Sequence, residues 1–92
     1  MTVARDPVEF GAVVEEVSRD MGALAEIRGV ALSATSEPLN VTGDLQRLRQ
    51  LVVILVDNAL KYTPAGGSVS VSCRRAGRRA ELRVSDTGPG IA

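Results

Sequence analysis

The sequence predicts a small α+β domain, and three observations support this fold class. Two segments repeat apolar residues at three- and four-residue spacing, which is typical of amphipathic helices. Other segments alternate apolar and polar residues with a period of two, as half-buried strands do. Glycine and proline separate these segments, so we expect a helix, two short strands, a helix and a hairpin. With 92 residues, the chain is long enough for one domain, 1–92.

The first half of the chain predicts one helix and two strands. Asp6-Pro7 is a helix-start signal, and the helix is expected to end near Arg28-Gly29. A short strand over 30–34 follows, then a turn at Glu37-Pro38 and a second short extended segment over 39–41. The apolar stripe of the helix is formed by Val13, Val14, Val17, Met21 and Leu24.

The second half predicts a buried helix and a hairpin. Asp44 is placed to cap a helix that stops at Thr63-Pro64. Its wide apolar face is expected to be well buried and comprises Leu45, Leu48, Leu51, Val52, Leu55, Ala59 and Leu60. Segments 68–73 and 82–85 alternate as strands around a turn at Ala76-Gly77, and the same alternation places Cys73 in the core.

Composition excludes several kinds of function. Eleven basic residues balance eleven acidic ones, which gives no global electrostatic argument for nucleic acid or an anionic membrane. The longest apolar run, 51–56, is far shorter than the roughly 20 residues of a membrane helix. A single cysteine permits no intrachain disulfide, so a reducing compartment is expected. The chain has no histidine, so any histidine chemistry must come from another domain or protein.

Asp86 follows the last predicted strand and has two interpretations. If Leu82 and Val84 face inward, alternation places Asp86 on the same face, where a desolvated carboxylate requires a hydrogen-bond donor. The donor would then be an amine of a ligand. The alternative is an exposed aspartate in a turn, which caps Gly88 beyond the end of the strand.

Two motifs carry a family resemblance. The segment Asn58-Ala59-Leu60-Lys61-Tyr62-Thr63-Pro64 resembles the asparagine box of sensor histidine kinases. The segment that begins at Asp86, 28 residues after Asn58, reads Asp-Thr-Gly-Pro-Gly-Ile and resembles their first glycine box. The resemblance covers nearly the whole chain. It implies part of a Bergerat fold, the fold of the gyrase, chaperone, histidine-kinase and mismatch-repair ATPases: a two-layer sandwich with two helices on one face of a mixed, mostly antiparallel sheet.

The resemblance also implies a site for ATP and magnesium. Asn58 would bind the Mg²⁺ that bridges the phosphates, and Lys61 would neutralise phosphate charge. Tyr62 would pack beside the adenine or ribose, and Asp86 would accept a hydrogen bond from the adenine amino group. Gly88 and Gly90 would let the backbone approach the base and hinge a lid. No residue of the chain is expected to be catalytic itself.

As the resemblance implies, the complete protein would be a cytoplasmic kinase, or the cytoplasmic part of a membrane-bound sensor. It would transfer the γ-phosphate to a histidine on a separate dimerisation domain and then to a response regulator. An anti-sigma-factor-type serine kinase and a non-catalytic pseudokinase module are the alternatives. The Lys61-Tyr62-Thr63-Pro64 ending favours the histidine-kinase branch.

Two departures from the family pattern shape these expectations. Ile54 stands one turn before Asn58, where related hydrolases have a glutamate that activates water, so transfer is favoured over hydrolysis. The lid, the second glycine box, the third helix and the closing strands of the family fold are not in the sequence. We therefore expect these residues alone to be inactive, to bind nucleotide weakly or not at all, and to expose a strand edge through which they self-associate.

Four arginines flank the predicted hairpin turn: Arg74, Arg75, Arg78 and Arg79. No aromatic residue lies between them, so a solvated loop is favoured over a nucleic-acid site. Docking of the phosphoacceptor helix is a further possibility.

Overall fold

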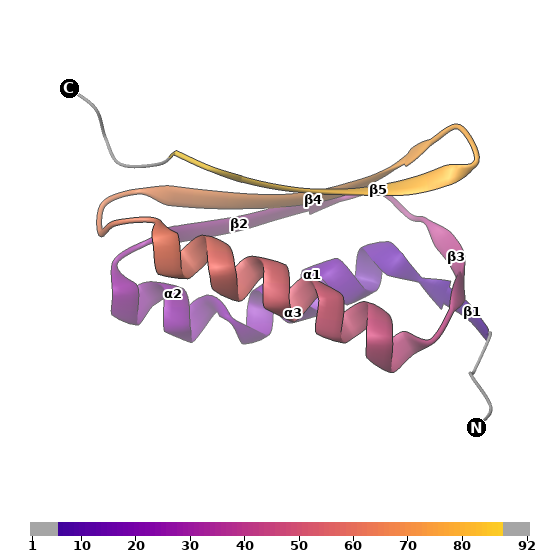
Figure 1. Ribbon diagram of the computed structural model, residues 1–92, viewed down its shortest axis with the longest axis horizontal. Helices are drawn as coiled ribbons and strands as arrows, with labels where there is room; N and C mark the ends of the chain where they lie inside the picture. Colours follow the sequence, from indigo (N-terminus) through magenta and orange to yellow (C-terminus); the bar gives the residue numbers. More distant parts are fainter. Residues whose placement is uncertain (1–5, 88–92) are drawn as a thin grey trace.

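The computed structural model describes residues 6–87 and has a helical layer beneath a sheet (Figure 1). The helices are α1 (Phe10–Asp20), α2 (Gly22–Arg28) and α3 (Leu45–Tyr62). The sheet has the order β2 (Ala31–Ser36), β4 (Ser68–Ala76), β5 (Arg79–Asp86), and a second small sheet pairs β1 (Asp6–Glu9) with β3 (Asn40–Gly43). The α+β class and the two-layer arrangement are confirmed.

The main sheet is mixed, as expected. β2 runs parallel to β4, with Ala31 opposite Ser68, and β5 runs antiparallel to β4, with Arg79 opposite Ala76. β1 and β3 are also antiparallel. In the described part of the chain β5 is an edge strand, with β4 at the centre.

The beginning of the chain differs from the prediction. Asp6-Pro7 opens strand β1 and not a helix, and the predicted single helix is divided at Met21 into α1 and α2. Because Pro7 has no amide hydrogen, it suits an edge strand as well as a helix start, so the local signal was ambiguous. Pairing with β3 decides the outcome. Glu9 then caps α1, because its carboxylate accepts a hydrogen bond from the backbone amide of Ala12.

The predicted helix ends are largely confirmed. Gly29 closes α2 in the left-handed conformation, with φ 71°, which glycine adopts without steric cost. Asp44 caps α3, since its Oδ1 accepts from the amides of Gln46 at 2.9 Å and Arg47 at 3.4 Å. The hairpin turn lies at Gly77-Arg78, one residue later than predicted.

Helix α3 is buried along a narrower stripe than its sequence suggests. Only Val52, Val56 and Leu60 are fully buried, whereas Leu51 and Leu55 are exposed. The core lies between the helices and the sheet and comprises Val8, Phe10, Val13, Val14, Val17, Ala25, Val30, Leu39, Val52, Val56, Leu60, Val69, Val71 and Cys73. The core position predicted for Cys73 is confirmed, and burial raises the pKa of its thiol, which makes the thiolate scarce at neutral pH.

Arg49 joins the two long helices. One guanidinium nitrogen lies 2.5 Å from Glu16 Oε1 and the other 2.7 Å from Asp20 Oδ2, so one side chain of α3 spans two turns of α1. The hydrogen bond to Glu16 and the two acidic charges raise the pKa of Arg49. These exposed ion pairs connect α3 to α1 at the surface of the helical layer.

Ser18 places an unfavourable polar group in the core. Its hydroxyl is buried and has no hydrogen-bond partner among residues 6–87, which costs about 1 kcal/mol or more. We expect Ser18→Ala to raise the free energy of unfolding by about 1 kcal/mol, because it removes that cost and adds helix propensity. Urea unfolding followed by circular dichroism measures the change, with Ser33→Ala on an exposed strand position as the control. A loss of stability in Ser18→Ala would show that the hydroxyl has a partner.

Candidate nucleotide-binding site

Three of the predicted site residues lie on the last turns of α3. Asn58, Lys61 and Tyr62 are all exposed, and Tyr62 retains 79% of its accessible surface. The buried side chains of Val56 and Leu60 fix the rotation of this part of the helix. The amide, the cation and the ring are therefore presented outward on a helix end that the core holds in place.

Asp86 ends β5, and only part of the sequence argument holds for it. Asp86 pairs with Val69, Val84 with Val71 and Leu82 with Cys73, so all three residues of β5 lie on the helix-facing side of the sheet, as alternation predicted. The Asp86 side chain is nevertheless exposed. The expectation that it is desolvated is wrong for the described residues, because alternation gives the face of the sheet but does not ensure that the face is covered at this position.

The end of α3 and the end of β5 meet through a short connection. Thr63 follows α3 and is buried, and its hydroxyl donates to the carbonyl of Ala59 at 2.7 Å. Thr87, next to Asp86, donates its amide to the carbonyl of Ser68 at 3.0 Å and accepts from the amide of Ser68 at 3.1 Å. Gly67 lies between the two threonines, since a Cβ there would be 2.6 Å from Thr63 Cγ2 and 3.0 Å from Thr87 Oγ1.

This connection brings the two motifs to one end of the molecule. β4 starts soon after α3 ends, and β5 returns along β4 to finish opposite Val69. Figure 1 shows both the C-terminal end of α3 and the end of β5 on the side away from the β4–β5 turn. Thr63 and Thr87 were not singled out in the sequence, although Thr87 stands beside Asp86 in a polar strand end.

Lys61 is already paired in this structure. Its Nζ lies 3.3 Å from Asp57 Oδ2, one helical turn earlier. The side chain of Asp57 therefore lies toward Lys61. Both side chains are partly exposed, so the pair is weak and Lys61 can leave it for a more highly charged anion.

The helix face beside Asn58 is apolar and open. Ile54 is 49% exposed and Leu51 47% exposed, and both lie on the turns that precede Asn58. No carboxylate stands at position 54, so this helix has no general base one turn before Asn58. The exposed strip contradicts the prediction of a well-buried helix.

The donors present suit a magnesium ion that is held mainly by a ligand. Residues 6–87 contain no group of three histidine, cysteine, aspartate or glutamate side chains that could hold a metal. Mg²⁺ is commonly bound through one or two protein oxygens together with phosphates and water. The exposed amide oxygen of Asn58 fits that pattern.

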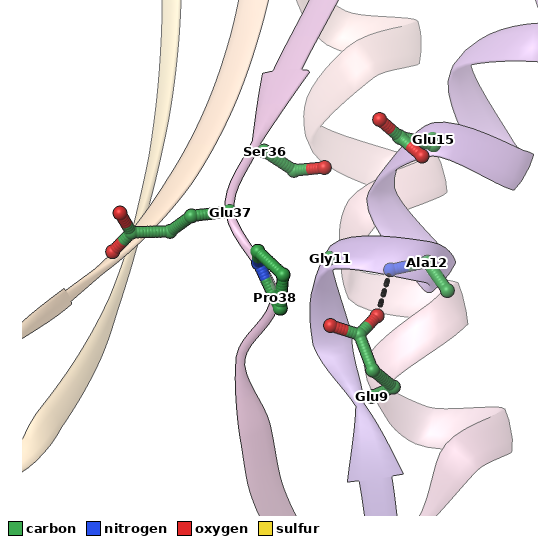
Figure 2. A pocket seen from close by; sticks show the side chains of 7 residues that line it. All are labelled: Glu9, Gly11, Ala12, Glu15, Ser36, Glu37 and Pro38. Carbon is green, nitrogen blue, oxygen red and sulfur yellow. Dashed lines mark hydrogen bonds between the residues drawn. The ribbon is translucent and has the colours of Figure 1, made fainter.

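The pocket in Figure 2 lies elsewhere. It has a volume of about 320 Å³ and is lined by Glu9, Gly11, Ala12, Glu15, Ser36, Glu37 and Pro38. Both carboxylate oxygens of Glu9 already accept hydrogen bonds within the chain. One accepts from the amide of Ala12 and caps α1, and the other accepts from the amide of Leu39 at 2.7 Å. Two further cavities, one beside α2 and β2 and one beside β1, also lack the predicted site residues.

Gly88 and Gly90, the two predicted site glycines, lie outside the described residues.

Within residues 6–87, no helix has both the length and the apolar character needed to cross a membrane.

Comparison with known proteins identifies the family. Residues 43–92 match the family described as histidine kinase-, DNA gyrase B-, and HSP90-like ATPases. The sensor protein kinase PmrB of Pseudomonas aeruginosa is 38% identical over 94% of this chain, which covers 18% of PmrB. The adaptive-response sensory kinase SasA of Thermosynechococcus vestitus is 52% identical over 55% of this chain, which covers 14% of SasA.

A solved structure agrees with the sequence comparisons. Full-length ShkA in complex with AMPPNP superposes with a TM-score of 0.85 at 29% identity, and the match covers all of this chain and 20% of ShkA. The chain thus spans less than a fifth of the two curated relatives. The chain belongs to the histidine kinase-, DNA gyrase B-, and HSP90-like ATPase family, and it is similar to the ATP-binding domains of sensor histidine kinases.

Proposed function

We propose that this chain forms one face of the ATP-binding site of a two-component sensor histidine kinase. Asn58 binds Mg²⁺, Lys61 binds phosphate oxygens, Tyr62 packs on the adenine or ribose, and Asp86 accepts from the adenine amino group. Gly88 and Gly90 let the backbone approach the base. Bound ATP supplies the γ-phosphoryl group, which passes to a histidine on a dimerisation domain and then to a response regulator.

The observation that carries this proposal is the juxtaposition at Gly67. The Thr63–Gly67–Thr87 contact holds the end of α3 against the end of β5, so groups for phosphate and for base lie on adjacent elements. The bound AMPPNP of the ShkA structure supports an ATP-like ligand for this fold. The identity to PmrB and SasA favours the histidine-kinase branch over an anti-sigma-type serine kinase.

Position 54 supports transfer rather than hydrolysis. Water attack on a phosphate is helped by a carboxylate that removes a proton, and Ile54 cannot do this. The chain contains no histidine, so the acceptor comes from another domain or subunit. Lys61 changes partner in this scheme, from Asp57 to the more highly charged phosphates.

The proposal is tested by nucleotide titration of the chain. Because Asn58, Tyr62 and Asp86 are exposed, we expect weak, magnesium-dependent binding of ATP, with NMR shift changes centred on the end of α3 and the end of β5. Asp86→Asn is expected to weaken ATP binding about tenfold, the value of one charge-assisted hydrogen bond. It should affect GTP, which has a carbonyl in place of the adenine amino group, much less.

Asp6→Asn is the matched control, since it makes the same change on an exposed residue of β1. It should leave ATP affinity unaltered. Equal effects of the two variants, or shift changes centred on the Glu9 pocket, would contradict the proposed site.

A further inference from the structure

The hairpin formed by β4 and β5 carries a concentrated positive charge. Residues 74–83 contain five arginines and one glutamate, a net charge of +4, although the whole chain is neutral. The remaining residues therefore sum to −4. We call residues 74–83 the arginine ribbon.

The ribbon extends beyond the core. The last buried residue of β4 is Cys73, and every residue from 74 to 80 is exposed. Leu82 is the residue of the ribbon that packs against the core, so packing does not explain the exposed arginines. The backbone of the ribbon is paired as far as Ala76 and Arg79, and the amide of Arg75 donates to Glu37 Oε1 at 2.7 Å. Figure 2 shows the Glu37 side chain pointing out of the pocket, toward the strands.

Three of the five arginines of the ribbon form no ion pair within the part of the chain that the structure describes. Glu81 is shared by Arg74, at 3.3 Å, and Arg83, at 3.6 Å. Arg75, Arg78 and Arg79 have no ion-pair partner among residues 6–87. Strand alternation places Arg74, Arg79, Glu81 and Arg83 on the sheet face opposite the helices. The same alternation places Arg75 on the other face, so the ribbon is cationic on both faces.

The side chains of the ribbon indicate the class of partner. The ribbon includes no aromatic side chain on which a base could stack, and its one large apolar residue, Leu82, packs against the core and is not free to enter a membrane. Guanidinium groups match carboxylates by paired hydrogen bonds. We propose that the arginine ribbon is a docking surface for an acidic segment of another protein.

This surface is separate from the proposed nucleotide site. β5 runs from Arg79 at the ribbon to Asp86 at the other end, so the two regions are at opposite ends of one strand (Figure 1). Docking at the ribbon leaves the exposed face of α3 open. The inference is independent of the function proposed above.

Fluorescence anisotropy of the 92-residue chain tests the proposal. The probe is a labelled peptide of about ten glutamates, long enough to cross the ribbon. We expect saturable binding that is lost when NaCl rises from about 50 mM to about 500 mM. The variant Arg75→Gln, Arg78→Gln, Arg79→Gln should bind about tenfold more weakly, since each exposed ion pair contributes a factor of a few.

A matched triple variant separates the ribbon from net charge. Arg19→Gln, Arg28→Gln, Arg47→Gln removes the same charge from exposed arginines with no ion pair in the described part of the chain, and should keep most of the affinity. Glu81→Gln should tighten binding severalfold, because it frees Arg74 and Arg83. Circular dichroism confirms that each variant is folded.

Three results would overturn the proposal. The first is no binding of the peptide by the unaltered chain. The second is equal weakening by both triple variants, which would indicate general charge attraction. The third is tighter binding of a single-stranded oligonucleotide of the same length than of the peptide, which would make nucleic acid the partner.

Discussion

Replacing Leu60 by alanine is expected to lower the free energy of unfolding by about 2–5 kcal/mol. Leu60 is 1% exposed and lies in the core between α3 and the sheet. The substitution removes buried apolar area and leaves a cavity that neighbouring β-branched valines fill poorly. A domain of this length has only about 0.05–0.15 kcal/mol of stability per residue, so the loss is a large part of the total.

Leu51→Ala is the matched control for Leu60→Ala. It makes the same change on the same helix, but Leu51 is 47% exposed and contributes less buried surface. We expect it to cost less than about 1 kcal/mol. Urea unfolding followed by far-UV circular dichroism compares the two. Similar losses would mean that the outer face of α3 is covered in solution, for example by a second copy of the chain.

Gly67→Ala is expected to damage both stability and nucleotide binding. A Cβ at this position would lie 2.6 Å from Thr63 Cγ2 and 3.1 Å from the carbonyl oxygen of Pro64. Thr63 is buried and bonded to Ala59, so it cannot move away freely. We expect a loss of about 1–3 kcal/mol from overpacking. Thr87 must also shift, which displaces Asp86 and weakens ATP binding further than the stability loss explains.

The control for this variant is Gly22→Ala, where the added methyl meets no atom within 4 Å. It should be neutral or slightly stabilising, since alanine favours a helix. Denaturant unfolding and ATP titration are measured on both variants. Gly67→Ala could instead lose stability and keep full ATP affinity. The contact between Thr63, Gly67 and Thr87 would then matter for folding alone, and it would no longer support the proposed nucleotide site.

The local signals in the sequence predicted most elements for physical reasons that act over a few residues. Asp44 caps α3 because its carboxylate reaches amides two and three residues later, and Gly29 ends α2 because it adopts positive φ without strain. The alternation in 68–73 and 82–85 likewise fixed the inward face of the hairpin. Each of these features depends on neighbours in the chain.

Features that depend on distant partners were missed. β1 forms because Asp6 to Glu9 pair with residues more than thirty positions away, which outweighed a helix-start signal at Asp6-Pro7. Leu51 and Ile54 are exposed because no other element of the described chain covers that side of α3. The apolar pattern of a helix does not show which of its faces other elements cover. The exposure of Asp86 has the same cause: alternation gives the face of the sheet, but not whether anything covers it.

The sequence by itself determined the class of fold and the two motifs that indicate a nucleotide site, because both are encoded in residue type and spacing. Only the tertiary structure decided that α3 and β5 end side by side, through Thr63, Gly67 and Thr87. It also showed that the arginines of the hairpin extend past the core with little compensating charge. Proximity between segments is set by packing of the whole chain, which no local pattern contains.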